Sequence, residues 1–186
     1  MSAHSENSSL SAKLHQATEV KSAKCYQCGK CSAGCPLSTE MEYPPSVIMR
    51  MLQTEDLKND RKILKSQTIW VCVSCEMCLS RCPMEIDIPK VMDFMRQKSI
   101  AEGLSNPKSK NIIRFHKAFL DSIKYTGRLH EISLVADYKM RSMHLTQDVM
   151  MVPKMLSRGK LPILPEIIKD KKKVSGFFKK SEHTNF

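Results

Sequence analysis

Apolar side chains between residues 45 and 127 recur at the three- and four-residue spacing of helices, and no stretch alternates as a strand does. Prolines, aspartates, asparagines and glycines at the ends of these stretches mark where helices start and stop. The pattern predicts helices over residues 45–52, 59–71, 87–103 and 106–127. The side chains predicted to face inward are Val47, Ile48, Met51, Leu52, Ile63, Leu64, Gln67, Trp70, Val71, Val91, Met92, Met95, Ser99, Ile112, Ile113, His116, Phe119, Leu120 and Ile123. The predicted fold class is all-α.

The two ends of the chain carry weaker patterns. Residues 1–24 are rich in Ser, Ala, His and Asn and are predicted to be a flexible tail, with at most a helical turn near Leu14. Two later helices are predicted over residues 130–140 and 146–158, and Pro153 is expected to bend the second helix or delay its start. The helical pattern therefore continues well beyond the middle of the chain.

Basic residues are concentrated in the second half. The formal net charge is +11, and residues 83–186 hold 20 basic and 11 acidic side chains, against 10 and 8 in residues 1–82. Residues 161–165 are too rich in proline for a helix and are predicted to be extended, and a basic tail with Phe177 and Phe178 follows. A basic half suits an acidic protein partner or an anionic membrane surface. Nucleic acid ranks last because the sequence lacks a nucleic-acid-binding motif.

All eight cysteines lie in two runs of identical spacing, C-x2-C-x2-C-x3-C-P, at residues 25–36 and 72–83. This is the spacing with which thiolates hold [4Fe–4S] clusters, and in two-cluster proteins the fourth cysteine of each run binds the other run's cluster. The predicted ligands are Cys25, Cys28, Cys31 and Cys82 for cluster 1, and Cys72, Cys75, Cys78 and Cys35 for cluster 2. Gly29 and Gly34 are expected to let the backbone approach the inorganic sulfur.

Structural zinc and disulfide bonds are the alternative interpretations of these cysteines. Zinc commonly takes four ligands in two pairs, whereas here four cysteines fall within eleven residues, twice. Disulfides are typical of secreted proteins, but the N-terminus has no apolar core of signal-peptide length and no stretch is long enough to span a bilayer. A cytoplasmic location, which favours thiolate-bound clusters, is the prediction.

No other motif in the sequence predicts catalysis. Glycine-rich nucleotide loops and nucleophile–base patterns are absent, and four protein ligands on each cluster leave no open iron for a substrate. His116 is interpreted as a core residue. Lys24, Lys30 and Arg81 stand beside the cysteines, where they could raise the cluster potential, although solvent or partner contact is the favoured interpretation. We therefore expect one-electron transfer without an active site.

Several motifs resemble the iron–sulfur C subunit of methanogen heterodisulfide reductase, a helical dicluster ferredoxin family. The resemblance is strong over residues 25–103 and useful over 150–170. Its motifs are CYQCGKCSAGCP from Cys25, MEYPPS from Met41, IWVCVSC from Ile69, DIP from Asp87 and RGKLPILP from Arg158.

The resemblance implies an electron relay within a larger complex. In that family the flavin-containing A subunit takes electrons from a hydrogenase or formate dehydrogenase and bifurcates them. The C subunit passes one branch to the catalytic B subunit, which reduces the CoM-S-S-CoB heterodisulfide in methanogenesis. This sequence has no adjacent Cys-Cys pair and no cysteine outside the two runs, which agrees with disulfide chemistry on another protein of the complex.

The sequence thus predicts a flexible tail at 1–24, a dicluster ferredoxin domain at 25–103, and a helical extension with a basic tail for docking to the complex at 104–186. One alternative function is the iron–sulfur subunit of a membrane-associated dehydrogenase of the succinate or anaerobic glycerol-3-phosphate type. Those proteins usually carry a further cluster or cysteine-rich domain, for which this chain has no cysteines. A cluster-based redox sensor is a third and weaker hypothesis.

Overall fold

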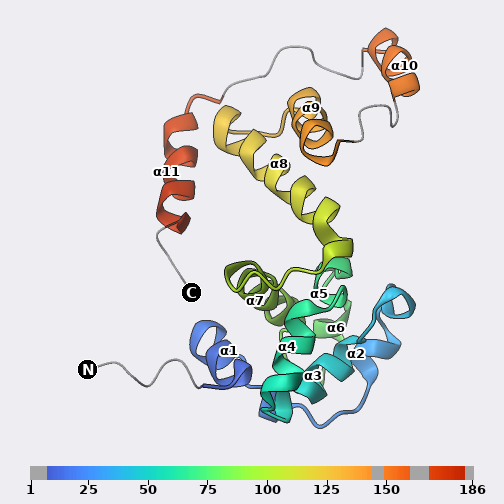
Figure 1. The fold of residues 1–186 in the computed structure, drawn as a ribbon, viewed down its shortest axis with the longest axis vertical. Coiled ribbons are helices and arrows are strands. Elements are labelled where there is room, and N and C mark those ends of the chain that lie inside the picture. Colours follow the sequence, from blue (N-terminus) through green and yellow to red (C-terminus); the bar gives the residue numbers. More distant parts are fainter. Residues whose placement is uncertain (1–7, 144–148, 160–167, 183–186) are drawn as a thin grey trace. The chain divides into compact units, whose positions relative to one another are not determined.

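The computed structural model describes residues 8–143, 149–159 and 168–182. These described residues form helices and turns without any strand, which confirms the all-α prediction. The chain divides into two compact units, residues 1–109 and 110–185, which are described separately (Figure 1). In the first unit the α-helices are α1 (Leu10–Thr18), α2 (Lys30–Ala33), α3 (Pro45–Gln53), α4 (Leu57–Lys65), α5 (Thr68–Val71), α6 (Met77–Ser80) and α7 (Ile88–Ala101). In the second unit they are α8 (Lys110–Thr126), α9 (Glu131–Ser142), α10 (Val152–Ser157) and α11 (Lys171–Glu182).

The core of the first unit lies where α1, α3, α4, α5 and α7 meet. Its fully buried side chains include Leu14, Ile48, Met49, Leu52, Ile63, Ile69, Val91, Met92 and Met95. Two polar ties connect the helices around this core: the Ser99 hydroxyl donates to the carbonyl of Leu64, and the Asn106 amide donates to the carbonyl of Lys65. Helix α7 is thereby fixed against α4, and α7 in turn helps to enclose the cysteine runs.

The folded part of the first unit begins before the first cysteine. Residues 10–18 form a helix, where the sequence predicted a tail with at most one turn, because Leu10 and Leu14 are buried against α3 and α7. The Ser9 side chain accepts a hydrogen bond from the backbone N–H of Ala12 and caps the helix. Residues 1–7 lie outside the described part of the chain.

Asp60 anchors the start of α1 from a distant helix. The predicted helix over 59–71 starts at Asn59 and Asp60, so the sequence suggested Asp60 as a cap of that helix. Asp56 occupies that position, and the buried carboxylate of Asp60 accepts instead from the backbone N–H of Leu10, at 2.9 Å. Its other oxygen has no hydrogen-bond partner among the residues that the structure describes. Burial raises the pKa of Asp60, because an unsatisfied carboxylate is poorly solvated in the core.

Replacing Asp60 should therefore separate its hydrogen-bonding role from its charge. Asp60→Ala leaves the Leu10 N–H without its acceptor and is expected to cost about 1–3 kcal/mol of unfolding free energy. Asp60→Asn keeps an acceptor oxygen and should cost less. Because the folded-state pKa is raised, the stabilising contribution of Asp60 is present at low pH and is lost as the pH rises through that pKa. Anaerobic urea unfolding across pH should show this loss in the natural protein and not in Asp60→Asn.

Two predicted helices of the first unit differ in detail from the structure. In α3 the predicted inward residues Ile48, Met51 and Leu52 are buried, but Val47 is exposed and Met49 is buried in its place. The predicted helix over 59–71 is two helices, α4 and α5, because the extended backbone of buried Ser66 breaks it. This break redirects the chain immediately before the second cysteine run.

Helix α7 matches its prediction closely. The Asp87 side chain accepts from the backbone N–H of Lys90, and Pro89 sits in the first turn, where a missing N–H costs nothing. The helix ends at Ala101, and Gly103, two residues later, has a φ of +65°, the left-handed conformation typical of a glycine that follows a helix. Its predicted inward residues are all buried.

The second unit is built on the helix pair of α8 and α9, against which α11 packs through α8. Arg141 of α9 forms an ion pair with Asp121 of α8 at 2.7 Å, which ties the two helices together, and a second ion pair with Asp137 of its own helix at 2.8 Å. Only Ala118 and Ser122 of α8 are buried, so the expected inward placement of His116 and Leu120 is wrong. The predicted helix over 130–140 is confirmed as α9, and its N-cap is His130.

The remaining C-terminal predictions fall partly outside the described residues. These include the start of the helix at 146 and the extended segment over 161–165. Pro153 lies in the first turn of α10, so the later start that it was expected to impose is observed. The expected basic tail contains a helix, α11, whose Phe177 is exposed.

Candidate iron–sulfur cluster site

The two cysteine runs share one local structure. Each contains a one-turn helix, α2 or α6, that begins two residues after the second cysteine. In each run, positive φ angles occur immediately before and after that second cysteine: Gln27 (62°) and Gly29 (74°) in the first run, Ser74 (50°) and Glu76 (62°) in the second. Because non-glycine residues rarely adopt positive φ, the repetition at equivalent positions indicates a duplicated backbone design. Sequence reasoning identified the repeated cysteines but not this strained turn.

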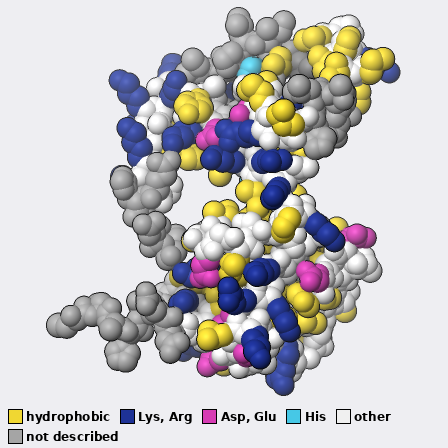
Figure 2. Space-filling view, viewed as in Figure 1, with side chains coloured by type: hydrophobic (Ala, Val, Ile, Leu, Met, Phe, Trp, Pro, Cys, Tyr) yellow, Lys and Arg dark blue, Asp and Glu magenta, His cyan; other side chains and the backbone are white. Residues whose placement is uncertain are grey.

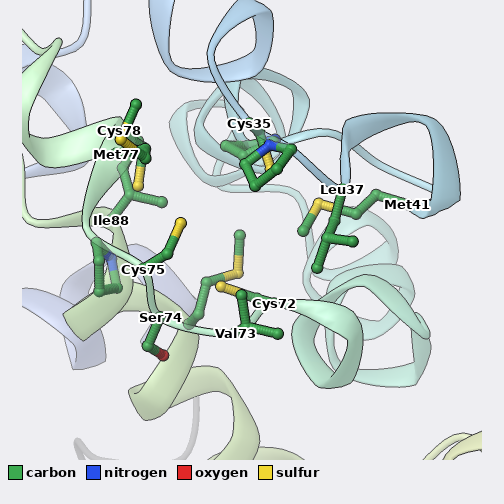
Figure 3. A pocket seen from close by; sticks show the side chains of 14 residues that line it. Cys35, Leu37, Met41, Cys72, Val73, Ser74, Cys75, Met77, Cys78 and Ile88 are labelled. Carbon is green, nitrogen blue, oxygen red and sulfur yellow. The ribbon is translucent and has the colours of Figure 1, made fainter.

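The structure gathers the eight cysteines around two cavities, with an exchange between the runs. The cavity that we name the first site is lined by Cys25, Cys28, Cys31 and Cys82. The second site is lined by Cys72, Cys75, Cys78 and Cys35 (Figure 3). In Figure 3, Cys35 approaches from the side opposite to Cys72 and Cys75. These are the same two groups of four that the sequence assigned to two clusters.

Both sites fit a group of the same kind. Their cavities are similar in size, at about 330 and 380 Å³. All eight cysteines are free thiols, and equivalent cysteines have matching exposure, with Cys31 and Cys78 buried and Cys28 and Cys75 exposed. Within the described residues, no three His, Cys, Asp or Glu side chains form a site for a single metal ion. Four thiols around a cavity of this size are suited to a cubane cluster.

Apolar packing surrounds the thiols on their inner side. Ile88, the first residue of α7, lines both cavities, so the two sites are near neighbours. Burial raises the pKa of the Cys78 thiol to about 11 and also raises that of Cys31. A thiol with such a pKa is protonated at neutral pH, and iron binding must displace this proton to form the thiolate ligand.

Several side chains hold the backbone of the runs in place. Arg96 of α7 donates to the carbonyls of Ile69 and Cys72, and its charge is paired with Asp93 at 2.8 Å. Gln53 of α3 donates to the carbonyls of Ser22 and Cys25. Sequence reasoning missed both residues, because a contact with a distant carbonyl leaves no mark in the local pattern.

The two glycines of the first run serve different purposes. Gly29 has positive φ and open space around it, so its conformation is what the turn requires. Gly34 has an ordinary φ, but a Cβ there would overlap the side chain of Arg81 from the second run. The close approach at Gly34 therefore accommodates an arginine, a neighbour that the sequence did not indicate.

Comparison with known families agrees with this geometry. Residues 21–86, which include both cysteine runs, match the family model described as a 4Fe-4S dicluster domain. This part of the chain carries a [4Fe–4S] dicluster domain. Two [4Fe–4S] clusters are thus the cofactors that the eight cysteines fit, and the zinc alternative is disfavoured.

Two curated relatives with similar sequences are C subunits of heterodisulfide reductases. The chain is 37% identical over 81 residues to the C subunit of the ferredoxin:CoB-CoM heterodisulfide reductase of Methanosarcina acetivorans, covering 44% of this chain and 31% of the relative. It is 33% identical over 99 residues to the iron-sulfur C subunit of the CoB–CoM heterodisulfide reductase of Methanopyrus kandleri, covering 53% and 50%. The resemblance to this family inferred from the motifs is confirmed. The matched segments span about a third to a half of these relatives.

None of the described helices is both long and apolar enough to cross a bilayer. Among the described residues of the second unit, several exposed apolar side chains lie on the six-residue helix α10 and the turn before it.

Proposed function

We propose that the chain is an electron relay that holds one [4Fe–4S] cluster in each site. The first site would take its four thiolates from Cys25, Cys28, Cys31 and Cys82, and the second from Cys72, Cys75, Cys78 and Cys35. The observation that carries the proposal is the pair of neighbouring four-cysteine cavities with Ile88 between them. Bound cubane clusters would supply one-electron redox chemistry.

The residues of the chain support conduction rather than catalysis. With four thiolates at each site, every iron corner has a protein ligand and no position is open for a substrate. The apolar lining, including Met49 at the first site and Met92 at the second, excludes water from the inner faces of the clusters. Exposed Cys28 and Cys75 leave an outer edge of each site accessible to a redox partner.

Within this relay, we assign the chain the role of the iron–sulfur C subunit in a heterodisulfide reductase complex. It would pass single electrons from the flavin-containing A subunit to the catalytic B subunit that reduces the CoM-S-S-CoB heterodisulfide. A hydrogenase or formate dehydrogenase would supply the electrons indirectly. The similarity to the corresponding proteins of two methanogens supports the assignment, and the dehydrogenase subunit is the second candidate.

The second unit offers a surface for docking to such a complex. Apolar side chains gather over α10 and the turn before it (Figure 2), where Met150 is 91% and Met151 59% exposed. Methionine-rich exposed surfaces are adaptable binding sites. Lys154 and Arg158 flank them with positive charge, which suits a partner surface that combines an apolar groove with acidic residues.

Purification under anaerobic conditions tests this function. A tagged chain should copurify with a flavoprotein and with a protein that contains Cys-Cys motifs. The double variant Met151→Glu/Met155→Glu should weaken this association by roughly tenfold or more, because buried apolar anchors at an interface are worth about 1–2 kcal/mol each. Its iron content should remain that of the natural protein.

Leu57→Glu is the matched control, since Leu57 is as exposed as Met151, at 58% against 59%, but lies on α4 of the first unit. It should leave the association unchanged. Copurification with a membrane-anchored dehydrogenase, without a protein that contains Cys-Cys motifs, would favour the second candidate. Equal weakening by Leu57→Glu would contradict docking through α10.

A further inference from the structure

The two sites differ in the charges beside their ligands. The residues adjacent to the cysteines of the first site include Lys24, Lys30 and Arg81 and no acid. Those adjacent to the cysteines of the second site include Glu76 and no cation. Arg81 precedes Cys82 of the first site, but its side chain lies against Gly34, the residue before Cys35 of the second site. Arg81 therefore does not separate the sites, and Lys24, Lys30 and Glu76 do.

Equivalent positions of the two runs make the difference specific. Lys30 lines the first site, and Met77, at the same position of the second run, lines the second. Gly29 of the first run corresponds to Glu76 of the second. The side chains of Lys30 and Glu76 are exposed, so solvent and salt partly screen the effect of their charges on the clusters.

Hydrogen bonds to cysteine sulfur atoms also distinguish the first site. The backbone N–H of Ile86 donates to Cys82 Sγ at 3.4 Å. The Gln27 amide nitrogen lies 3.4 Å from Cys25 Sγ. The reversed amide would instead donate to the carbonyl of Ser46 and accept from the backbone N–H of Arg50, but a cluster thiolate is only an acceptor and favours the nitrogen beside it.

Other influences on the reduction potential are matched or neutralised. Equivalent cysteines have the same exposure class at the two sites, so solvent access does not separate them. Arg96 is a cation close to the second run, but it contacts backbone carbonyls and is paired with Asp93. Charge and hydrogen bonding to sulfur are therefore the factors that distinguish the sites.

We propose that Lys30 and its neighbours give the first site the more positive reduction potential, so that an electron resting on the relay occupies the first site. The inference rests on the proposed function, because it requires a cluster in each site. Added positive charge and sulfur hydrogen bonds stabilise the reduced, more negative cluster. Electrons would then enter through the second site, whose rim carries exposed Val73 and Met77, and leave through the first.

A redox titration of the anaerobically purified holoprotein, followed by visible absorption and electron paramagnetic resonance, tests the order. Two reduction waves are expected. Lys30→Met, which copies the second run, should shift the more positive wave to lower potential and leave the other in place. The reciprocal Met77→Lys should shift the more negative wave upward.

Lys62→Met is the control, because Lys62 is an exposed lysine on α4 that lines neither site. It should move neither wave. A shift of the more negative wave by Lys30→Met, or no shift by either run variant, would overturn the proposal. Should Met77→Lys lose iron, Lys30→Met alone still decides the order. A natural protein with fewer than two clusters would refute the proposed function itself, which iron and sulfide analysis detects separately.

Discussion

Replacing Cys35 with alanine is expected to destroy the cluster that the three other cysteines of the second site hold, and to leave the first site loaded. Cys35 belongs to the first run by sequence but lines the cavity of Cys72, Cys75 and Cys78. Loss of one of four thiolates opens an iron corner to solvent and destabilises the cubane. We expect about four of about eight irons to remain, as chemical analysis under anaerobic conditions would measure.

Cys82→Ala is the mirror control for this experiment. Cys82 belongs to the second run by sequence but lines the first site, so its loss should spare the second cluster. The two variants should therefore retain spectroscopically different clusters. If each variant lost the cluster of its own run instead, the exchange of ligands between the runs would be refuted. Lys62→Met again provides an unperturbed reference of the same unit.

Removing the iron from the natural protein is expected to unfold residues 21–86 rather than merely to empty two pockets. Helices α2 and α6 have four residues each, far below the length at which an isolated helix is stable. The turns before them hold Gln27, Ser74 and Glu76 at positive φ, which costs about 1–3 kcal/mol for each residue. Metal–thiolate bonds provide the free energy that keeps such segments ordered.

Hydrogen exchange measured before and after anaerobic chelation tests this expectation. Protection should be lost over α2 and α6 and should spread to α3 and α7, which pack against them. Helices α8 and α9 of the second unit should keep their exchange rates, because no cysteine lies in that unit. Unchanged protection across residues 21–86 would contradict a structural role for the clusters.

Where the local sequence determines the outcome, the prediction succeeds. Asp87, Pro89 and Gly103 predict the limits of α7, which the structure confirms, and the spacing of the cysteines predicts the two groups of four ligands. These features depend on residues within one or two turns of each other. The prediction was less accurate wherever a distant residue intervened, as at α1, whose apolar residues are too few to indicate a helix until α3 and α7 cover them.

The electrostatic difference between the sites also depends partly on the local sequence and partly on contacts between distant residues. Lys30, Arg81 and Glu76 are visible in the sequence, but only the structure shows that Arg81, which precedes Cys82 of the first site, packs against Gly34 beside Cys35 of the second site. Likewise, His116 follows an inward-looking helical pattern and is exposed in the structure, because α8 buries only a narrow strip of small residues.

The sequence by itself determined the cofactor type, the all-α fold class and the resemblance to the heterodisulfide reductase family, because cluster chemistry imposes a fixed spacing on its thiolates. Tertiary structure decided the features that depend on residues far apart in the chain. These are the anchoring of α1 by Asp60, the support of the cysteine runs by Arg96 and Gln53, and the placement of Ile88 between two adjoining sites. Such contacts form only when distant helices pack, and no periodicity along the chain encodes them.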